Sequence, residues 1–396
     1  MIFREIYLNK IAKFIDEEEI KVITGVRRCG KTYFLKQIIE KLKLNGIRDE
    51  NIIYIPFESS IYDNIKTYSD LNEYIFEKCE SISGKVYLFF DEIQLVEDWE
   101  KSINAYRIDL DCDIYITGSN SNLLSGQLAT LLSGRYVTLN LFPLSFNEIL
   151  GYYDGRKNEM SIFNEYVRYG GFPRILRFDE DEKEYFLEDI YNAIVLKDII
   201  YKNEVRDADF LDRFIKFMLS NIGQVFSISS IQKYLKHERI DLSLHTIKTY
   251  LNQSMDAFIF YRVPRQDLKN KKILTVNEKY YCVDLGFYNV QNAINKSRGA
   301  MLENIVFLEL KRRGFKVSVG NINNLEIDFV AQKANKTIYI QVSESILDEN
   351  TRIREFKSLE KVKDNYPKYV LSLDSWDYSQ NGIIHKNIID FLKEEW

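Results

Sequence analysis

The stretch Gly25-Val26-Arg27-Arg28-Cys29-Gly30-Lys31-Thr32 decides how the first part of this chain is expected to fold. Its spacing is GxxxxGKT, and it lies between an apolar run at 20–23 and apolar residues at helical spacing from 34 to 42. In such a strand, loop and helix, backbone N–H groups at the helix N-terminus surround phosphate, the lysine adds positive charge and the threonine hydroxyl reaches Mg²⁺. The pattern therefore predicts a nucleotide-binding loop. The loop residues expected to bind the nucleotide are Gly25, Arg27, Arg28, Cys29, Gly30, Lys31, Thr32 and Tyr33.

A second motif, Val86-Tyr87-Leu88-Phe89-Phe90-Asp91-Glu92, is an apolar run that ends in two carboxylates. A strand this apolar is expected to be buried on both faces of a parallel sheet, and such sheets bind ligands at the carboxyl ends of their strands. We therefore expect Asp91 to hold Mg²⁺ together with Thr32. Glu92 is then the natural general base to activate a water molecule, which favours hydrolysis over phosphoryl transfer to a metabolite.

Length and composition indicate an ordered protein of two or three domains, with 396 residues, 45% hydrophobic and 29% charged. The net charge of −5 excludes a global basic field that would attract nucleic acid or membrane. The charged N-terminus and the lack of a long apolar run predict a cytoplasmic protein without membrane contact. The four cysteines lack metal-ligand spacing and are expected to be reduced thiols, with Cys29 oxidisable if exposed.

Strand-like runs at 52–57, 86–90, 113–117 and 136–141 alternate with helical segments such as 61–81. With the strand before the phosphate loop they predict a five-stranded α/β sheet, in which another strand separates the phosphate-loop strand from the carboxylate strand. The run at 113–117 leads into Gly118-Ser119-Asn120-Ser121. These small polar groups either sense the γ-phosphate or only cap the next helix.

The motifs GVRRCGKT, LFFDEIQ, ITGSNSNLLS, LLSGRY, LFPLSFNEIL and YGGFPRIL follow one another in this order. In this the chain resembles the bacterial and archaeal AAA-type ATPases of the AAA_14/DUF4143 family. The resemblance implies ATP and Mg²⁺ as cofactors, Ser119 or Asn120 as a nucleotide sensor, and a homo-oligomer. It also offers Arg135 as an arginine finger acting across a subunit interface or as a second sensor, the alternative being a surface arginine.

Four segments are expected along the chain. The P-loop ATPase domain spans 1–150, and a helical lid or linker at 151–206 contains the helix-breaking Gly170-Gly171-Phe172-Pro173. Residues 207–290 have the pattern of a winged helix, with helices at 210–220, 227–235 and 243–252 and strands at 259–263 and 273–282. Residues 291–396 form the last segment.

The winged-helix segment is locally basic. Between residues 232 and 272 nine Lys or Arg and four acids give a net charge of +5. The tip of the expected hairpin suits contacts to the phosphates of double-stranded DNA. A solvated turn or a protein-contact module is the alternative. The candidate DNA contacts are Arg265, Lys269, Lys271 and Lys272.

The last segment resembles the PD-(D/E)xK nuclease fold. A helix at 299–312 contains Glu303, and a strand at 325–331 contains Glu326 and Asp328. The next strand reads Gln341-Val342-Ser343 where such nucleases place a metal-binding Glu and a catalytic Lys. The expectation is a degenerate domain that is structural or contacts DNA without cutting it.

Together these patterns predict an ATP-hydrolysing, AAA-type ATPase whose cycle moves a C-terminal module that contacts DNA or protein. Two alternatives remain from the sequence. One is an ATP-gated nuclease that cuts at Glu303 and Asp328, and the other is a scaffold that nucleotide occupancy switches without turnover.

Overall fold

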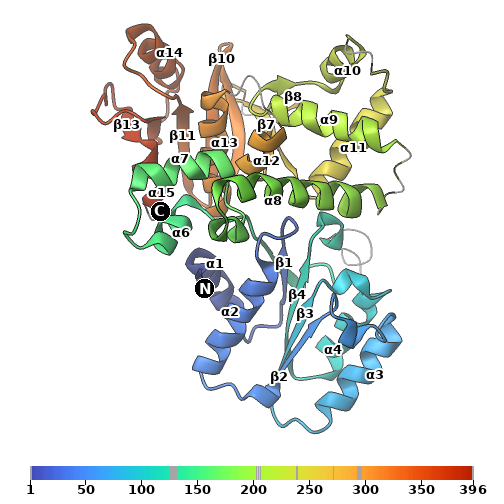
Figure 1. Cartoon of the computed structure of the whole chain (residues 1–396). Coiled ribbons are helices and arrows are strands. Elements are labelled where there is room, and N and C mark those ends of the chain that lie inside the picture. The colour runs from blue at the N-terminus through green and yellow to red at the C-terminus, as the bar shows by residue number, and fades with distance from the viewer. Residues whose placement is uncertain are drawn as a thin grey trace. The chain divides into compact units, whose positions relative to one another are not determined.

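The computed structural model describes residues 2–124, 132–201, 203, 205, 207–237, 240–270, 272–291 and 297–394. The chain forms two compact units (Figure 1). The first consists of Met1–Phe142 with Asp256–Phe258, and the second of Pro143–Met255 with Ile259–Trp396. Among the described residues, no helix combines the length and the apolar character needed to cross a bilayer.

The first unit is built on a parallel five-stranded sheet of order β2-β3-β4-β1-β5. This confirms the expected α/β fold, and β4 does separate β1, which precedes the phosphate loop, from β3, which carries the carboxylates. The strands are β1 (Ile20–Thr24), β2 (Ile52–Pro56), β3 (Val86–Asp91), β4 (Cys112–Gly118) and β5 (Tyr136–Asn140).

Helices cover both faces of this sheet, α1 (Glu5–Ile11) and α2 (Lys31–Leu44) on one face, α3 (Tyr68–Cys79) and α4 (Trp99–Asp109) on the other (Figure 1). The helix expected at 61–81 was wrong at its start. The α-helix begins only at Tyr68, because Thr67 and Asp70 form a capping box that fixes the N-terminus there.

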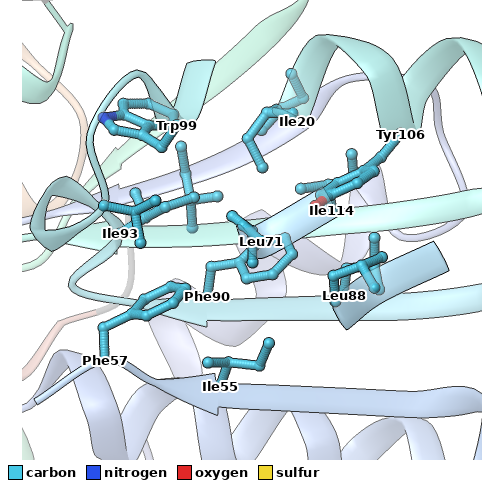
Figure 2. Packing of buried hydrophobic residues seen from close by; sticks show 14 of the residues in the cluster. Ile20, Ile55, Phe57, Leu71, Leu88, Phe90, Ile93, Trp99, Tyr106 and Ile114 are labelled. Atoms are coloured by element: carbon cyan, nitrogen blue, oxygen red, sulfur yellow. The ribbon is translucent and has the colours of Figure 1, made fainter. Parts of the chain in front are cut away.

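The core between the sheet and helices α3 and α4 is aromatic and aliphatic. Figure 2 shows Phe57 and Phe90 beside each other. Their rings are stacked, and the ring centroids are 6.2 Å apart. All six residues of β3 are buried, which agrees with the double-sided burial expected of this run. Each fully buried Leu or Phe side chain stabilises the fold by about 1.5–3 kcal/mol, so this core holds β3 and its terminal carboxylates in place.

The second unit combines helices with a mixed eight-stranded sheet of order β13-β12-β11-β10-β9-β7-β8-β6. Its helices are α6 (Phe146–Tyr153), α7 (Glu159–Tyr169), α8 (Glu180–Ala193), α9 (Ala208–Ser220), α10 (Ile228–His237), α11 (Leu244–Asp256), α12 (Leu285–Gln291), α13 (Arg298–Arg312), α14 (Glu349–Glu360) and α15 (Ile388–Lys393). Its strands are β6 (Val225–Phe226), β7 (Phe260–Asp267), β8 (Lys272–Cys282), β9 (Lys316–Ile322), β10 (Leu325–Lys333), β11 (Lys336–Val342), β12 (Lys368–Ser372) and β13 (Ile384–Asn387).

The elements expected between 207 and 290 are present as α9, α10, α11, β7 and β8. The β7–β8 hairpin is not a free wing, however. Strand β7 also pairs in parallel with β9 through Arg265–Asp267, so the hairpin continues into the C-terminal sheet. The division into a lid, a winged helix and a nuclease-like domain stays a prediction.

Candidate nucleotide-binding site

The loop after β1 has the backbone that close approach of a phosphate requires. Gly25 has φ 154° and Gly30 has φ 106°, a region that L side chains rarely adopt. A Cβ at Gly25 would lie 2.2 Å from the Leu141 carbonyl oxygen, so only glycine fits there. Helix α2 begins at Lys31, directly after the loop, and presents its N-terminal N–H groups to it.

Lys31 lies at the centre of this site and is buried. Its Nζ donates to the carbonyl oxygens of Gly25 at 3.1 Å and Val26 at 3.4 Å, and it lies 3.2 Å from Oε1 of Glu92. Burial alone would lower the pKa of Lys31, but the Glu92 carboxylate raises it above its usual value. The ammonium group is therefore charged at neutral pH.

Asp91, at the end of β3, receives hydrogen bonds from three hydroxyl groups. Thr32 Oγ1 donates to it at 2.6 Å, Thr117 Oγ1 at 2.6 Å and Tyr54 OH at 3.2 Å. Burial, and then the Asp91 charge, raise the pKa of the Tyr54 hydroxyl, which stays a donor. The adjacent Thr32 hydroxyl and Asp91 carboxylate are the oxygen ligands that Mg²⁺ prefers, so the residues present fit this ion.

Glu92 follows in the left-handed region, with φ 58°, which is uncommon for a residue other than glycine. Its N–H donates to Thr117 Oγ1 at 2.9 Å, and its carboxylate accepts from Gln94 Nε2. Burial alone would raise the pKa of Glu92, but Lys31 and then Gln94 hold it below its usual value. The carboxylate is therefore ionised, as a general base must be.

Ser119 and Asn120 directly follow β4, between the strands that carry the phosphate loop and Asp91. Both are buried. The sheet order thus brings them to the same edge as Lys31 and Asp91. This is the position that a sensor of the γ-phosphate requires, although the sensing role stays a prediction.

The other loop residues differ in exposure. Arg28 and Tyr33 are exposed, and Arg27 is half-buried with its Nη1 3.3 Å from Oε1 of Glu58. Cys29 is fully buried, and burial raises the pKa of its thiol. Cys29 was expected to be oxidisable only if it is exposed, and this condition is not met.

Arg135 does not join the other candidates. It is exposed and lies directly before β5, where its carbonyl oxygen accepts a hydrogen bond from Ile20 N at 2.9 Å. Ile20 begins β1, whereas the phosphate loop follows the other end of that strand. The five residues of β1 span about 16 Å, so Arg135 and the loop lie at opposite edges of one sheet.

Four residues that contact the site were not singled out from the sequence. Gln94 and Thr117 stand within motifs that were recognised. The available signal was the place of Gln94 two residues after Glu92 and that of Thr117 at the end of the strand-like run 113–117. No signal in the sequence pointed to Arg4, because the residues that it contacts are distant in the chain. It is buried, and its guanidinium donates to the carbonyl oxygens of Phe142 at 2.7 Å and Cys29 at 3.3 Å. Tyr54, on β2, is the fourth.

The candidate DNA contacts in the second unit are not alike. Lys269 and Lys272 are exposed at the turn between β7 and β8. Arg265 is half-buried within β7, which is paired on both sides. Lys271 lies outside the described residues.

Comparison with known proteins finds relatives along the whole chain. A family model described as an AAA domain matches residues 17–150, and a domain of unknown function, DUF8612, matches residues 160–298. An uncharacterised protein of Haemophilus influenzae is 43% identical over 404 residues, which cover 99% of this chain and 98% of that protein. An uncharacterised protein of Methanocaldococcus jannaschii is 34% identical over 92% of this chain and 86% of its own length.

Among solved structures, a Walker-type ATPase of Pyrococcus abyssi has a TM-score of 0.50 at 15% identity, covering 74% of this chain and 96% of that one. At this identity the likeness concerns the fold alone. The DUF4143 assignment stays a prediction. The two relatives of nearly full length show that the chain belongs to one family with them, and the match at residues 17–150 shows that it carries an AAA domain.

Proposed function

We propose that this chain hydrolyses ATP with Mg²⁺ at the edge of the first unit's sheet. The observation that carries the proposal is the meeting of the two sequence motifs there. The Thr32 hydroxyl lies 2.6 Å from Asp91, and Lys31 Nζ lies 3.2 Å from the neighbouring Glu92. A phosphate site, a site for a divalent cation and an ionised base are thus adjacent.

In this proposal the loop N–H groups and Lys31 bind the phosphates. Thr32 and Asp91 hold Mg²⁺, which supplies positive charge to the phosphate oxygens when bound. Binding requires Lys31 to leave the Glu92 carboxylate, since one ammonium group has to turn toward the incoming phosphate. The released Glu92 then orients a water molecule and takes its proton.

The experiment that tests this compares Lys31→Ala with Glu92→Gln. Lys31→Ala removes the phosphate charge and is expected to abolish ATP binding. Glu92→Gln removes only the base, so ATP binding persists and hydrolysis falls by at least about a hundredfold. Binding is measured by calorimetry and turnover by phosphate release. Hydrolysis at the parent rate in Glu92→Gln would contradict the assignment of the base.

We further propose that ATP turnover moves the second unit, and that its basic hairpin turn contacts duplex DNA. Support comes from the exposure of Lys269 and Lys272 and from the net charge of +5 over residues 232–272. Contacts to phosphates predict DNA affinity that falls steeply with salt and an ATPase rate that changes when duplex is added. Affinity unaltered after substitution of both lysines by Ala would leave the turn as a protein-contact element.

A further inference from the structure

A buried lysine lies among the acidic residues of the second unit that resemble a nuclease centre. Lys279 of β8 is 3% exposed. Its Nζ lies 2.7 Å from Oε1 of Glu303 on α13, 2.8 Å from Oε1 of Glu326 on β10 and 3.7 Å from Oδ1 of Asp328 on β10. One ammonium group therefore stands among three carboxylates that come from two other elements.

Two of these carboxylates also accept hydrogen bonds from other groups. Oε1 of Glu303 also accepts a hydrogen bond from the Tyr281 hydroxyl, and Oδ2 of Asp328 accepts from the Val342 N–H at 2.8 Å. Gln341 stands where such nucleases place a metal-binding Glu, but its amide group is engaged in hydrogen bonds within the protein. Its Oε1 accepts from the Asp328 N–H at 2.7 Å and its Nε2 donates to Glu355 at 2.8 Å.

The electrostatics of the cluster fit a resident ammonium. Burial alone would lower the pKa of Lys279, but Glu303, Asp328 and Glu326 raise it well above its usual value. Burial, and then the Glu303 charge, raise the pKa of Asp328. A second cation here would meet the Lys279 charge within a few ångströms in a poorly solvated site. With the Lys279 ammonium group in place, no group of three or more His, Cys, Asp or Glu side chains among the described residues is arranged to hold a metal ion.

A nuclease of the PD-(D/E)xK type needs a divalent cation on these acids, and the residues present do not fit one. We propose that the Lys279 ammonium group takes the place of that cation, so that Glu303, Glu326 and Asp328 form an internal ion-pair centre that joins β8, α13 and β10. The second unit then has no divalent-cation chemistry. This inference concerns the second unit and stands apart from ATP hydrolysis in the first.

The proposal predicts that removal of Lys279 turns the cluster into a cation site. The test uses the full chain without nucleotide and the variant Lys279→Met, with Mn²⁺ as the probe. The concentration of free Mn²⁺ is measured by electron paramagnetic resonance, which gives the amount bound. The melting temperature is measured in EDTA and in Mn²⁺. Lys311→Met is the matched control, because Lys311 lies on α13 and its pKa is lowered by burial alone.

Lys279→Met is expected to melt below the parent in EDTA, to regain at least half of that loss in Mn²⁺, and to bind one more Mn²⁺ per chain than the parent. The affinity of the added site should exceed any in the parent by about tenfold or more, because three carboxylates lose their counter-charge. The double variant Lys279→Met/Glu303→Gln should lose this response to Mn²⁺. The Lys311→Met control should bind Mn²⁺ as the parent does.

A second variant keeps the proposal testable if Lys279→Met does not fold. In the parent background, Asp328→Asn should leave both Mn²⁺ binding and DNA integrity unchanged. Loss of a parental Mn²⁺ site in Asp328→Asn would overturn the proposal. Mn²⁺-dependent cutting of a plasmid by the parent that Asp328→Asn abolishes would do the same, and would favour the nuclease alternative.

Discussion

Glu92 is the residue whose surroundings matter most for the proposed chemistry. It lies in a strained backbone region, and two side chains, Lys31 and Gln94, keep its carboxylate ionised. Lys31 is expected to move to the phosphate when ATP binds. Gln94 then becomes the main group that orients the base, which makes it a positioning residue.

The variant Gln94→Leu tests this role. Loss of the donor raises the pKa of Glu92, and a base works only above its pKa, so the acid limb of the kcat profile is expected to shift to higher pH. At neutral pH kcat should fall by about tenfold while ATP affinity changes by less than about twofold. The measurement is phosphate release between pH 5 and 9. Gln332→Leu, at an exposed glutamine of β10, serves as control, and an unshifted acid limb in Gln94→Leu would remove Gln94 from the mechanism.

At the scale of elements, Asp284 ties the start of α12 to the glycine turn after α7. Its two carboxyl oxygens accept from Gly171 N at 2.7 Å and Gly286 N at 2.8 Å. A Cβ at Gly170 would lie 1.6 Å from Oδ1 of Asp284, so the turn needs glycine to admit the carboxyl group. Burial raises the pKa of Asp284 to about 7, although both N–H groups act in the opposite sense.

This pKa predicts a pH dependence of stability. The folded chain keeps a proton on Asp284 up to about pH 7, whereas the unfolded chain releases it near pH 4. Between these values the folded state binds more protons, so this group's contribution to the free energy of unfolding falls as the pH rises. Compared with Asp284→Asn, the parent should lose about 2–4 kcal/mol more between pH 4.5 and 7.5 in urea unfolding. Exposed Asp181→Asn is the control, and equal slopes in parent and Asp284→Asn would contradict the prediction.

At the scale of the whole molecule, the place of Arg135 bears on assembly. It lies at the edge of the sheet opposite the phosphate loop, so it does not reach the nucleotide of its own subunit. An arginine finger at this position therefore requires a second copy of the chain, with Arg135 of one subunit meeting the phosphate loop of the next. Hydrolysis per subunit is then expected to rise with protein concentration.

Mixing two inactive variants tests the arrangement. Arg135→Ala subunits keep the base, and Glu92→Gln subunits keep the finger, so some mixed interfaces contain both intact groups. Phosphate release is expected to recover to about a quarter of the parent rate in an equal mixture, because about one interface in four combines both. Mass in solution with and without ATP is the companion measurement. If activity does not recover at any ratio and the mass in solution is that of a monomer, Arg135 is only a surface residue and not an arginine finger.

The sequence by itself determined the α/β fold of the first unit, its phosphate loop and the position of Asp91 and Glu92 at the end of a buried strand. These features depend on local patterns, such as glycine spacing, helical periodicity and an apolar run. Such patterns can be recognised in a single sequence. The observed sheet order and the match to an AAA domain at residues 17–150 agree with these predictions.

Only the tertiary structure decided which distant residues meet. Lys279 of β8 lies among the carboxylates of Glu303, Glu326 and Asp328. The sequence indicated only that the run 341–343 lacks the lysine of a nuclease. Asp284 likewise reaches the turn at Gly171, and Arg4 reaches Cys29. Such contacts depend on strand order, on register and on helices packing across a sheet, and a one-residue change of register would turn each strand side chain to the other face. No local pattern in the sequence encodes them.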